Sequence, residues 1–98
     1  MILIKIHKTP NGAVIAMCDK DLIGKTFEEN ELSLTVSENF YNGREVSDKK
    51  ELLKIIKNAP NMNIIGKESV DFAIKNHVID KNNVILIKKV PHATKLLT

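Results

Sequence analysis

Strand-forming patterns come before helix-forming patterns in this chain, and that order constrains the fold more than any other feature. Isoleucine stands at every second position over residues 2–7, and a second apolar run covers residues 13–18. The period of two predicts strands. The turn signal Pro10-Asn11-Gly12 lies between them, so we expect a β-hairpin. Leu32–Val36 alternates apolar with hydroxyl residues, which predicts a third strand with one buried face and one hydroxyl-lined face.

Two helices are expected in the second half of the chain. Asp48 and Glu51 have the spacing of an N-terminal capping box, and an apolar stripe at helical spacing follows until Pro60 ends it. The second helix is expected to begin at Ile65 or Gly66 and to run to residue 76, with residue 76 or 77 in the left-handed conformation.

A dense aliphatic run at Val84–Ile87 predicts a strand in a central or well-covered place in the sheet, and either a short final strand or a tail follows the break at Pro91-His92. The predicted order is therefore β-β-β-α-α-β, with the terminal strand left open. Strands followed by helices favour an α+β fold: a mainly antiparallel sheet of four to five strands with two helices packed on one face. The length of 98 residues is typical of one domain, so residues 1–98 are expected to form a single domain.

Composition excludes several classes of protein. Cys18 is the one cysteine, so neither an intrachain disulfide nor a zinc cluster built from thiols can form. Apolar runs are too short to cross a membrane, and no secretory cleavage pattern follows the first residues. We therefore expect a cytoplasmic protein that has no membrane partner. The net charge of +3 comes almost wholly from lysine, since Arg44 is the one arginine.

Glycine-lysine pairs at Gly24-Lys25 and Gly66-Lys67 imitate part of a phosphate loop. A phosphate loop needs a further glycine five positions earlier, where Asp19 and Asn61 stand instead. We therefore expect no nucleotide site. Gly66 and Lys67 still open a predicted helix, where free N–H groups and one cation can form an anion-binding site, although Glu68 offsets the helix dipole and a tight entry turn is the commoner role of such a segment.

Groups able to do acid-base or nucleophilic chemistry are few. Cys18 ends an apolar strand, where a small buried side chain is the commoner role. The histidines have no metal-ligand spacing, so we expect neither a metal site nor a cofactor. His92 follows Pro91 on an apparent exit from the sheet, and Asp19 and Tyr41 lie in predicted loops, so these three are the candidates for a shared pocket.

Five motifs occur in order along nearly the whole chain. They are Cys18-Asp19, Leu22–Lys25, Phe40–Gly43, Ile65–Val70 with Ala73-Ile74, and Val90–Ala93. Together they resemble the archaeal family catalogued as domain of unknown function 424. The chain departs from the usual pattern of that family at His77 and Thr94, where glycine and glutamine are usual. The resemblance implies an archaeal source and a small stand-alone protein, and it implies no activity.

The sequence therefore predicts a non-catalytic binding module, with RNA or a ribosome-associated protein as its partner. The expected surface joins the Phe40–Gly43 turn, the loop from Asp19 to Lys25 and the segment around His92, with Lys88 and Lys89 supplying further positive charge. Its named positions are Asp19, Lys25, Tyr41, Gly43 and His92. The alternatives are a small enzyme with an Asp19, Tyr41 and His92 pocket, and a homodimeric adaptor that uses its hydroxyl-lined strand.

Overall fold

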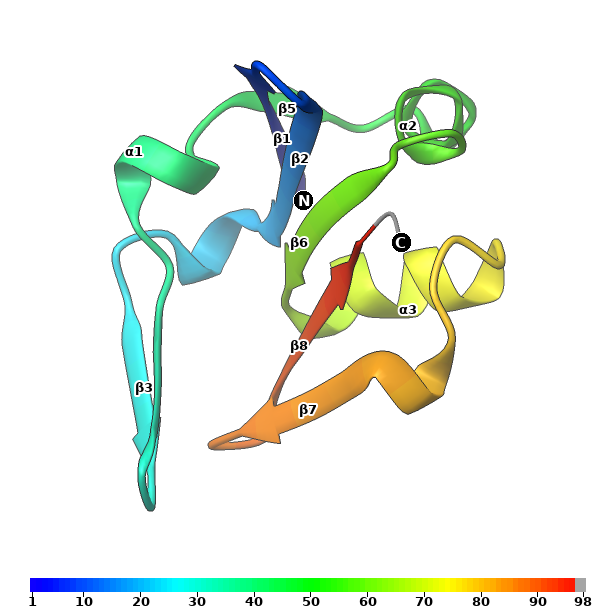
Figure 1. Cartoon of the computed structure of the whole chain (residues 1–98). Coiled ribbons are helices and arrows are strands. Elements are labelled where there is room, and N and C mark those ends of the chain that lie inside the picture. Colours follow the sequence, from blue (N-terminus) through cyan, green and yellow to red (C-terminus); the bar gives the residue numbers. More distant parts are fainter. Residues whose placement is uncertain (97–98) are drawn as a thin grey trace.

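The computed structural model describes residues 1–96, and Figure 1 shows the arrangement of its elements. Its strands are β1 (Ile2–Thr9), β2 (Gly12–Asp19), β3 (Thr26–Glu29), β4 (Leu32–Thr35), β5 (Arg44–Val46), β6 (Asn61–Ile65), β7 (Val84–Ile87) and β8 (Val90–Lys95). Its α-helices are α1 (Glu38–Tyr41), α2 (Lys49–Ile56) and α3 (Lys67–Lys75), with single 3₁₀ turns at Lys20–Leu22 and Lys81–Asn83.

Six strands form one mixed sheet in the order β5-β1-β2-β6-β8-β7, and β3 and β4 form a separate two-stranded ribbon. Strand β6 runs parallel to β2, whereas the other pairs in the sheet are antiparallel. The predicted fold, a mainly antiparallel sheet of four to five strands with two helices, is therefore wrong. The sheet has more strands, it contains a parallel pair, and three α-helices accompany it.

The main difference from the prediction is β6, which lies where a connection between two helices was expected. Its residues lie between Pro60 and Gly66, and two asparagines interrupt the apolar pattern. Three of its five side chains are buried, and Ile65 pairs in register with Cys18 of β2. A strand this short carries too few residues to show its period, and burial in the middle of the sheet overrides its weak intrinsic preference.

Several local predictions are confirmed. The hairpin closes with Thr9 opposite Gly12. The Oδ1 atom of Asp48 accepts hydrogen bonds from the backbone N–H groups of Lys50 and Glu51 at 2.9 and 3.4 Å, which caps α2. His77 adopts the left-handed conformation after α3, with φ at 60°. Each of these features is decided by neighbouring residues, which is why a single sequence reveals them.

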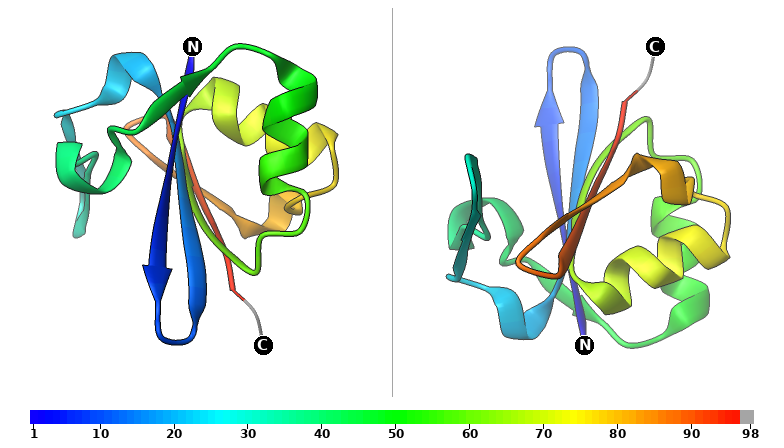
Figure 2. Two further views of the ribbon diagram at one scale, coloured as in Figure 1. Left: turned by 90° about the horizontal axis from the view of Figure 1, so that it is seen from above. Right: turned by 90° about the horizontal axis from the view of Figure 1, so that it is seen from below.

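The sheet is covered on both faces, as Figure 2 shows. Helices α2 and α3 cover one face, called here the helical face; α1 and the β3–β4 ribbon cover the other, called the ribbon face. Core residues of the helical face include Ile4, Met17, Leu52, Ile56, Ile64 and Val70, and those of the ribbon face include Leu3, Cys18, Val36, Tyr41, Ile65 and Ile87. Burial of this apolar surface on two sides is the main source of stability.

Strand β7 lies at the edge of the sheet and not in its centre, contrary to the prediction for this aliphatic run. Ile85 and Leu86 are 49% and 60% exposed, whereas Ile87 is buried on the ribbon face. Aliphatic composition reports a preference for extended backbone, and it does not report how many neighbours the strand has. The position of β7 therefore leaves large apolar side chains on the surface.

Candidate functional site

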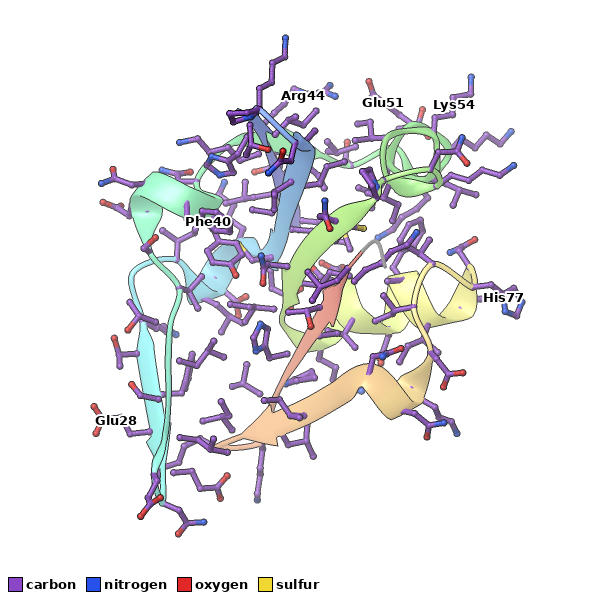
Figure 3. The ribbon with its side chains drawn as sticks, viewed as in Figure 1. Glu28, Phe40, Arg44, Glu51, Lys54 and His77 are labelled. Carbon is purple, nitrogen blue, oxygen red and sulfur yellow. The ribbon has the colours of Figure 1, made fainter. Side chains whose placement is uncertain are left out.

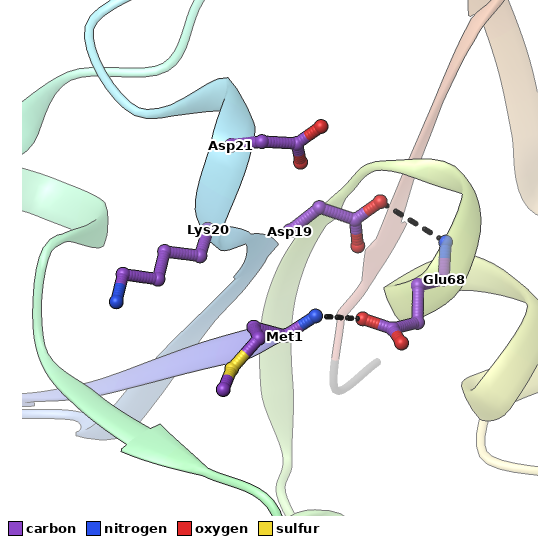
Figure 4. A pocket seen from close by; sticks show the side chains of 5 residues that line it. All are labelled: Met1, Asp19, Lys20, Asp21 and Glu68. Atoms are coloured by element: carbon purple, nitrogen blue, oxygen red, sulfur yellow. Dashed lines mark hydrogen bonds and ion pairs between the residues drawn. The ribbon is translucent and has the colours of Figure 1, made fainter.

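Asp19 ends β2 and caps a helix that begins far away in the sequence. One carboxylate oxygen, Oδ2, accepts a hydrogen bond from the backbone N–H of Glu68 at 3.0 Å. The other, Oδ1, accepts from the backbone N–H and the hydroxyl of Ser69, both at 2.8 Å. Figure 4 shows the carboxylate aimed at the first turn of α3. Asp19 thus serves as the capping residue that this helix lacks in its own sequence.

The Gly66-Lys67 segment, named as a candidate anion site, already holds an anion of the chain itself. A Cβ atom on Gly66 would lie 2.5 and 2.7 Å from the two carboxylate oxygens of Asp19, so only glycine leaves room for them. Gly66 also has φ at 112°, where side chains are disfavoured. The carboxylate therefore occupies the N–H groups that would have bound an external anion.

A second acidic group lies beside the Asp19 cap. The Met1 ammonium group is 2.6 Å from Oε1 of Glu68, and the hydrogen bond between them lowers the pKa of the Glu68 carboxyl group. These residues, with Lys20 and Asp21, line a shallow pocket of about 580 Å³ that Figure 4 shows from close by. Asp19 and Glu68 are both engaged with donors of the chain, so neither carboxylate is free to bind an external cation.

His92 and Tyr41 lie on the opposite side of the sheet from Asp19. The register places His92 beside Ile65 in β6, on the ribbon face, where Tyr41 belongs to the core. Asp19 stands opposite Ile2, whose side chain is in the core of the helical face. The structure therefore brings His92 and Tyr41 to one face and separates Asp19 from both.

Burial favours the neutral forms of the ionisable groups on the ribbon face. It raises the pKa of the Cys18 thiol to about 12, with smaller contributions from the charges of Asp19 and Asp21. It also raises the pKa of the Tyr41 hydroxyl to about 12. The pKa of His92 is lowered by burial, so its imidazole is neutral at pH 7. No group in this set is an ionised nucleophile or a charged acid at neutral pH.

The Phe40–Gly43 turn is held against β1 by side chains of that strand. The ring of His7 stacks on Phe40 with centroids 4.4 Å apart, and its Nε2 lies 2.8 Å from the Phe40 carbonyl oxygen. The Nζ group of Lys5 donates to the Asn39 carbonyl at 2.6 Å. At Gly43 a Cβ atom would collide with the Ile4 carbonyl oxygen and lie 2.8 Å from the Ile4 carbonyl carbon, so this glycine permits a close approach of two backbones.

The aromatic rings of the chain are all used in packing. Tyr41 meets the Phe40 ring edge-on at 4.9 Å, Phe27 packs against the ribbon-face core, and the Lys49 ammonium lies 5.2 Å from the centre of the Phe72 ring. Lys25 is exposed, and its backbone N–H and C=O groups are hydrogen-bonded within the loop and to β4's end. The expected surface therefore offers charge but no free ring for a base to stack on.

A different pocket opens on the helical face, between α3 and the β7–β8 hairpin. Its volume is about 430 Å³, within the usual range for small ligand sites. We call it the lysine pocket, and its lining residues are Lys67, Val70, Asp71, Ile74, Lys81, Val84, Leu86, Lys89 and Pro91. An apolar floor is thus surrounded by three lysines and one aspartate, and the aspartate pairs with Lys67 at 3.6 Å.

Lys67 and Lys89 were both expected to supply positive charge, but their proximity was not predicted. Lys67 opens α3, Lys81 lies in a 3₁₀ turn, and Lys89 lies in the turn between β7 and β8. No spacing rule connects three such segments. The signal available in the sequence was the aliphatic run of β7 followed at once by two lysines, which is typical of an exposed strand end and not of a central strand.

Within residues 1–96, no group of three or more His, Cys, Asp or Glu side chains is arranged to hold a metal ion. Within the same residues, none of the helices has the length and apolar character needed to cross a bilayer.

Comparison with known proteins places the chain in a family. The model of the family described as "Protein of unknown function (DUF424)" matches residues 6–96. A search of the curated proteins finds no match. The crystal structure of an uncharacterized conserved protein from Methanopyrus kandleri has a TM-score of 0.78 and 22% sequence identity, with 99% of this chain and 93% of that chain covered, and it supports the fold alone. The resemblance seen in the five motifs is confirmed, and the chain belongs to the DUF424 family of proteins of unknown function.

Proposed function

We propose that this protein is a non-catalytic binding module that holds an anionic partner at the lysine pocket. The observation that supports this function is the convergence of Lys67, Lys81 and Lys89 around one apolar depression. The three ammonium groups outnumber the one carboxylate, so the pocket attracts negative charge. Its apolar floor favours a partner that also buries apolar groups there.

The state of the reactive groups favours binding over catalysis. An enzyme with Asp19, Tyr41 and His92 in one pocket needs these side chains on one face, and Asp19 lies on the other. The Asp19 carboxylate also accepts three hydrogen bonds from the first turn of α3. Using it as a general base would require breaking the cap of a helix, which is an unfavourable way to start a reaction.

The two partner classes expected from the sequence were RNA and a ribosome-associated protein. Lysine is a mobile point charge, so the pocket attracts RNA phosphates without reading their sequence. If the partner is a ribosomal component, the protein cosediments with ribosomes at low salt and dissociates as salt rises. Absence from ribosomal fractions at every salt concentration would remove this class of partner.

A charge-reversal experiment tests the location of the site. The double variant Lys81→Glu/Lys89→Glu inverts the rim of the lysine pocket. Its matched control is Lys54→Glu/Lys57→Glu at α2, which changes net charge equally; Figure 3 shows Lys54 far from the β7 end of the sheet. The probes are a fluorescein-labelled acidic peptide and a labelled single-stranded RNA, measured by anisotropy at low salt.

The expected result is a loss of affinity of about tenfold or more for the pocket variant with at least one probe, and about twofold or less for the control. Equal losses in both variants would mean that net charge alone attracts the probes. Failure of both probes to bind the unaltered protein would also overturn the proposed function.

A further inference from the structure

We infer that the anionic partner is an extended acidic polypeptide segment that adds as a strand to the outer edge of β7. This inference rests on the proposed function and names the class of partner. It follows from three properties of β7: its open hydrogen-bonding edge, its exposed apolar side chains, and the lysines that surround one of its faces.

The open edge is the first property. Strand β7 ends the six-stranded sheet, and within residues 1–96 it pairs with β8 alone. Natural edge strands are normally protected by charged side chains, proline or bulges. The sequence of β7, Val84-Ile85-Leu86-Ile87, contains none of these, and its middle two side chains are about half exposed or more. Such an edge is a template for another strand.

The backbone groups of β7 that point outward determine where a partner strand can pair. Ile87 and Val90 close the turn as a bonded pair, so the groups of Val84 and Leu86 point away from β8. The Val84 N–H donates to the Lys81 carbonyl. Among the residues that the structure describes, no hydrogen bond occupies the outward N–H of Leu86. The free pairing position is therefore at Leu86.

The chain itself shows how an acidic group docks at this edge. The next outward N–H beyond Leu86 belongs to Lys88, and it donates to Oε1 of Glu29 at 3.0 Å. Glu29 ends β3, so the acidic end of the β3–β4 ribbon already covers the turn. Figure 1 shows this ribbon beside the β7–β8 turn. A partner strand can therefore occupy the Val84–Leu86 portion and must stop before Glu29.

The two faces of β7 specify the side chains of the partner. Val84 and Leu86 line the lysine pocket on the helical face, while Ile85 and Ile87 face the ribbon side. Side chains of an added strand alternate between the same two faces. A partner strand that directs its carboxylates toward the lysines and packs its apolar side chains against Ile85 matches both faces of β7. The preferred segment therefore alternates acidic with apolar residues.

The same features disfavour the other occupants. A second copy of this chain paired edge to edge would bring Lys81 and Lys89 of both copies together, with like charges opposed. RNA has no peptide groups to pair with Leu86, and the aromatic rings that could stack on its bases are packed within the protein. An acidic strand uses the hydrogen bonds, the apolar surface and the charge at once.

The test compares two labelled peptides of one composition, one with glutamate and valine alternating and one with the two residues in separate blocks. Binding is measured by anisotropy. The variant Leu86→Pro removes the free N–H, and proline is tolerated where the donor faces outward at an edge. Its matched control, Leu86→Ala, loses the side chain and keeps the donor. A version of the alternating peptide with N-methylated central residues removes the complementary bonds in the intact protein.

The alternating peptide is expected to bind at least about fivefold more tightly than the block peptide, since only one of them can place all its acids on the lysine face. Leu86→Pro and N-methylation should each weaken it by about fivefold relative to their controls, the effect of about one hydrogen bond. The N-methylated peptide keeps the test decisive if Leu86→Pro does not fold.

Failure of this inference and failure of the proposed function give different results. Equal binding of the two peptides, or no effect of N-methylation, overturns strand addition even where Lys81→Glu/Lys89→Glu still abolishes binding. Lysine-dependent binding of RNA without binding of the alternating peptide also overturns it, and leaves the anion-binding function standing. Loss of lysine dependence for every probe overturns both.

Discussion

The Oδ1 atom of Asp19 accepts hydrogen bonds from both the backbone N–H and the hydroxyl of Ser69, each at 2.8 Å. These residues are fifty positions apart, so the bond pair fixes the end of β2 to the beginning of α3. Ser69 is fully buried, and the carboxylate satisfies a hydroxyl that would otherwise be costly there. The motif positions at Asp19 and Gly66 thus have a structural role as one unit.

Removal of the Asp19 carboxylate should destabilise the fold. In Asp19→Ala the N–H groups of Glu68 and Ser69 and the buried Ser69 hydroxyl lose their acceptor, and we expect a loss of about 2–3 kcal/mol in the free energy of unfolding. Urea denaturation measures this loss. Asp21→Ala is the matched control, because Asp21 is an exposed neighbour in the same loop. A similar loss in both variants would show that loop charge matters and the cap does not.

Asp19 and Gly66 should behave as a coupled pair. Gly66→Ala places a methyl group against the Asp19 carboxylate and strains a residue whose φ is 112°, so we expect a loss of about 2 kcal/mol or more. In an Asp19→Ala background the steric part disappears, and the same substitution should cost less. A double-mutant cycle by urea denaturation measures the coupling. Additive losses would mean that backbone strain alone explains this glycine.

The features predicted correctly are those that neighbouring residues decide. The Asn11-Gly12 turn, the Asp48 cap of α2 and the left-handed His77 depend on residues within a few positions. The topology depends on partners far away in the sequence, and the strand at Asn61–Ile65 was missed for this reason. Its place in the middle of the sheet is decided by Cys18 and Ala93 on either side, which no local pattern reveals.

The candidate site shows the same contrast between local features, which were predicted, and long-range contacts, which were not. Asp19 and Gly66 were each recognised, yet the use of one to cap the other's helix depends on tertiary structure alone. The expected gathering of Asp19, Tyr41 and His92 failed because strand register sends Asp19 to the other face. The lysine pocket combines three segments whose proximity follows from β7 being an edge strand. The chemical character of single residues could therefore be predicted from the sequence, whereas which of them lie close together in the fold could not.

The Cys18 thiol should be unreactive in the folded protein. It is fully buried, and its pKa of about 12 leaves almost no thiolate, the reactive form, at pH 8. A thiol reagent should label the native protein on the order of 10³-fold more slowly than the protein unfolded in urea, since labelling waits for opening of the core. Rapid labelling without denaturant would show that this side of the sheet opens readily.

Stability should decrease as pH falls below about 6.5 because of His92. Burial lowers the pKa of His92 in the folded state from its ordinary value of 6.5, so the unfolded chain takes up the proton more readily. The neutral imidazole therefore makes its full contribution to stability at pH values above the pKa of His92 in the unfolded chain. This contribution is lost as the pH falls toward the lower pKa of His92 in the folded protein. Urea denaturation at pH 7.5 and 5.5 should show a smaller decrease for His92→Gln than for the unaltered protein. An equal decrease in both proteins would assign the pH dependence to other groups.

The β7–β8 turn should be less stable than a turn built from the residues preferred there, because it holds two lysines, one of which lines the lysine pocket. Lys88 and Lys89 have φ at 52° and 67°, the positive values of a type I′ turn, for which asparagine and glycine are preferred. Lys88→Asn/Lys89→Gly should therefore raise the free energy of unfolding by about 1 kcal/mol. The same variant removes one ammonium group from the pocket, so it should bind the alternating acidic peptide more weakly. Lys88→Asn alone retains Lys89 and should gain part of the stability without losing affinity. Urea denaturation and peptide anisotropy measure the two effects on the same samples, and a double variant that binds as tightly as the unaltered protein would exclude Lys89 from the site.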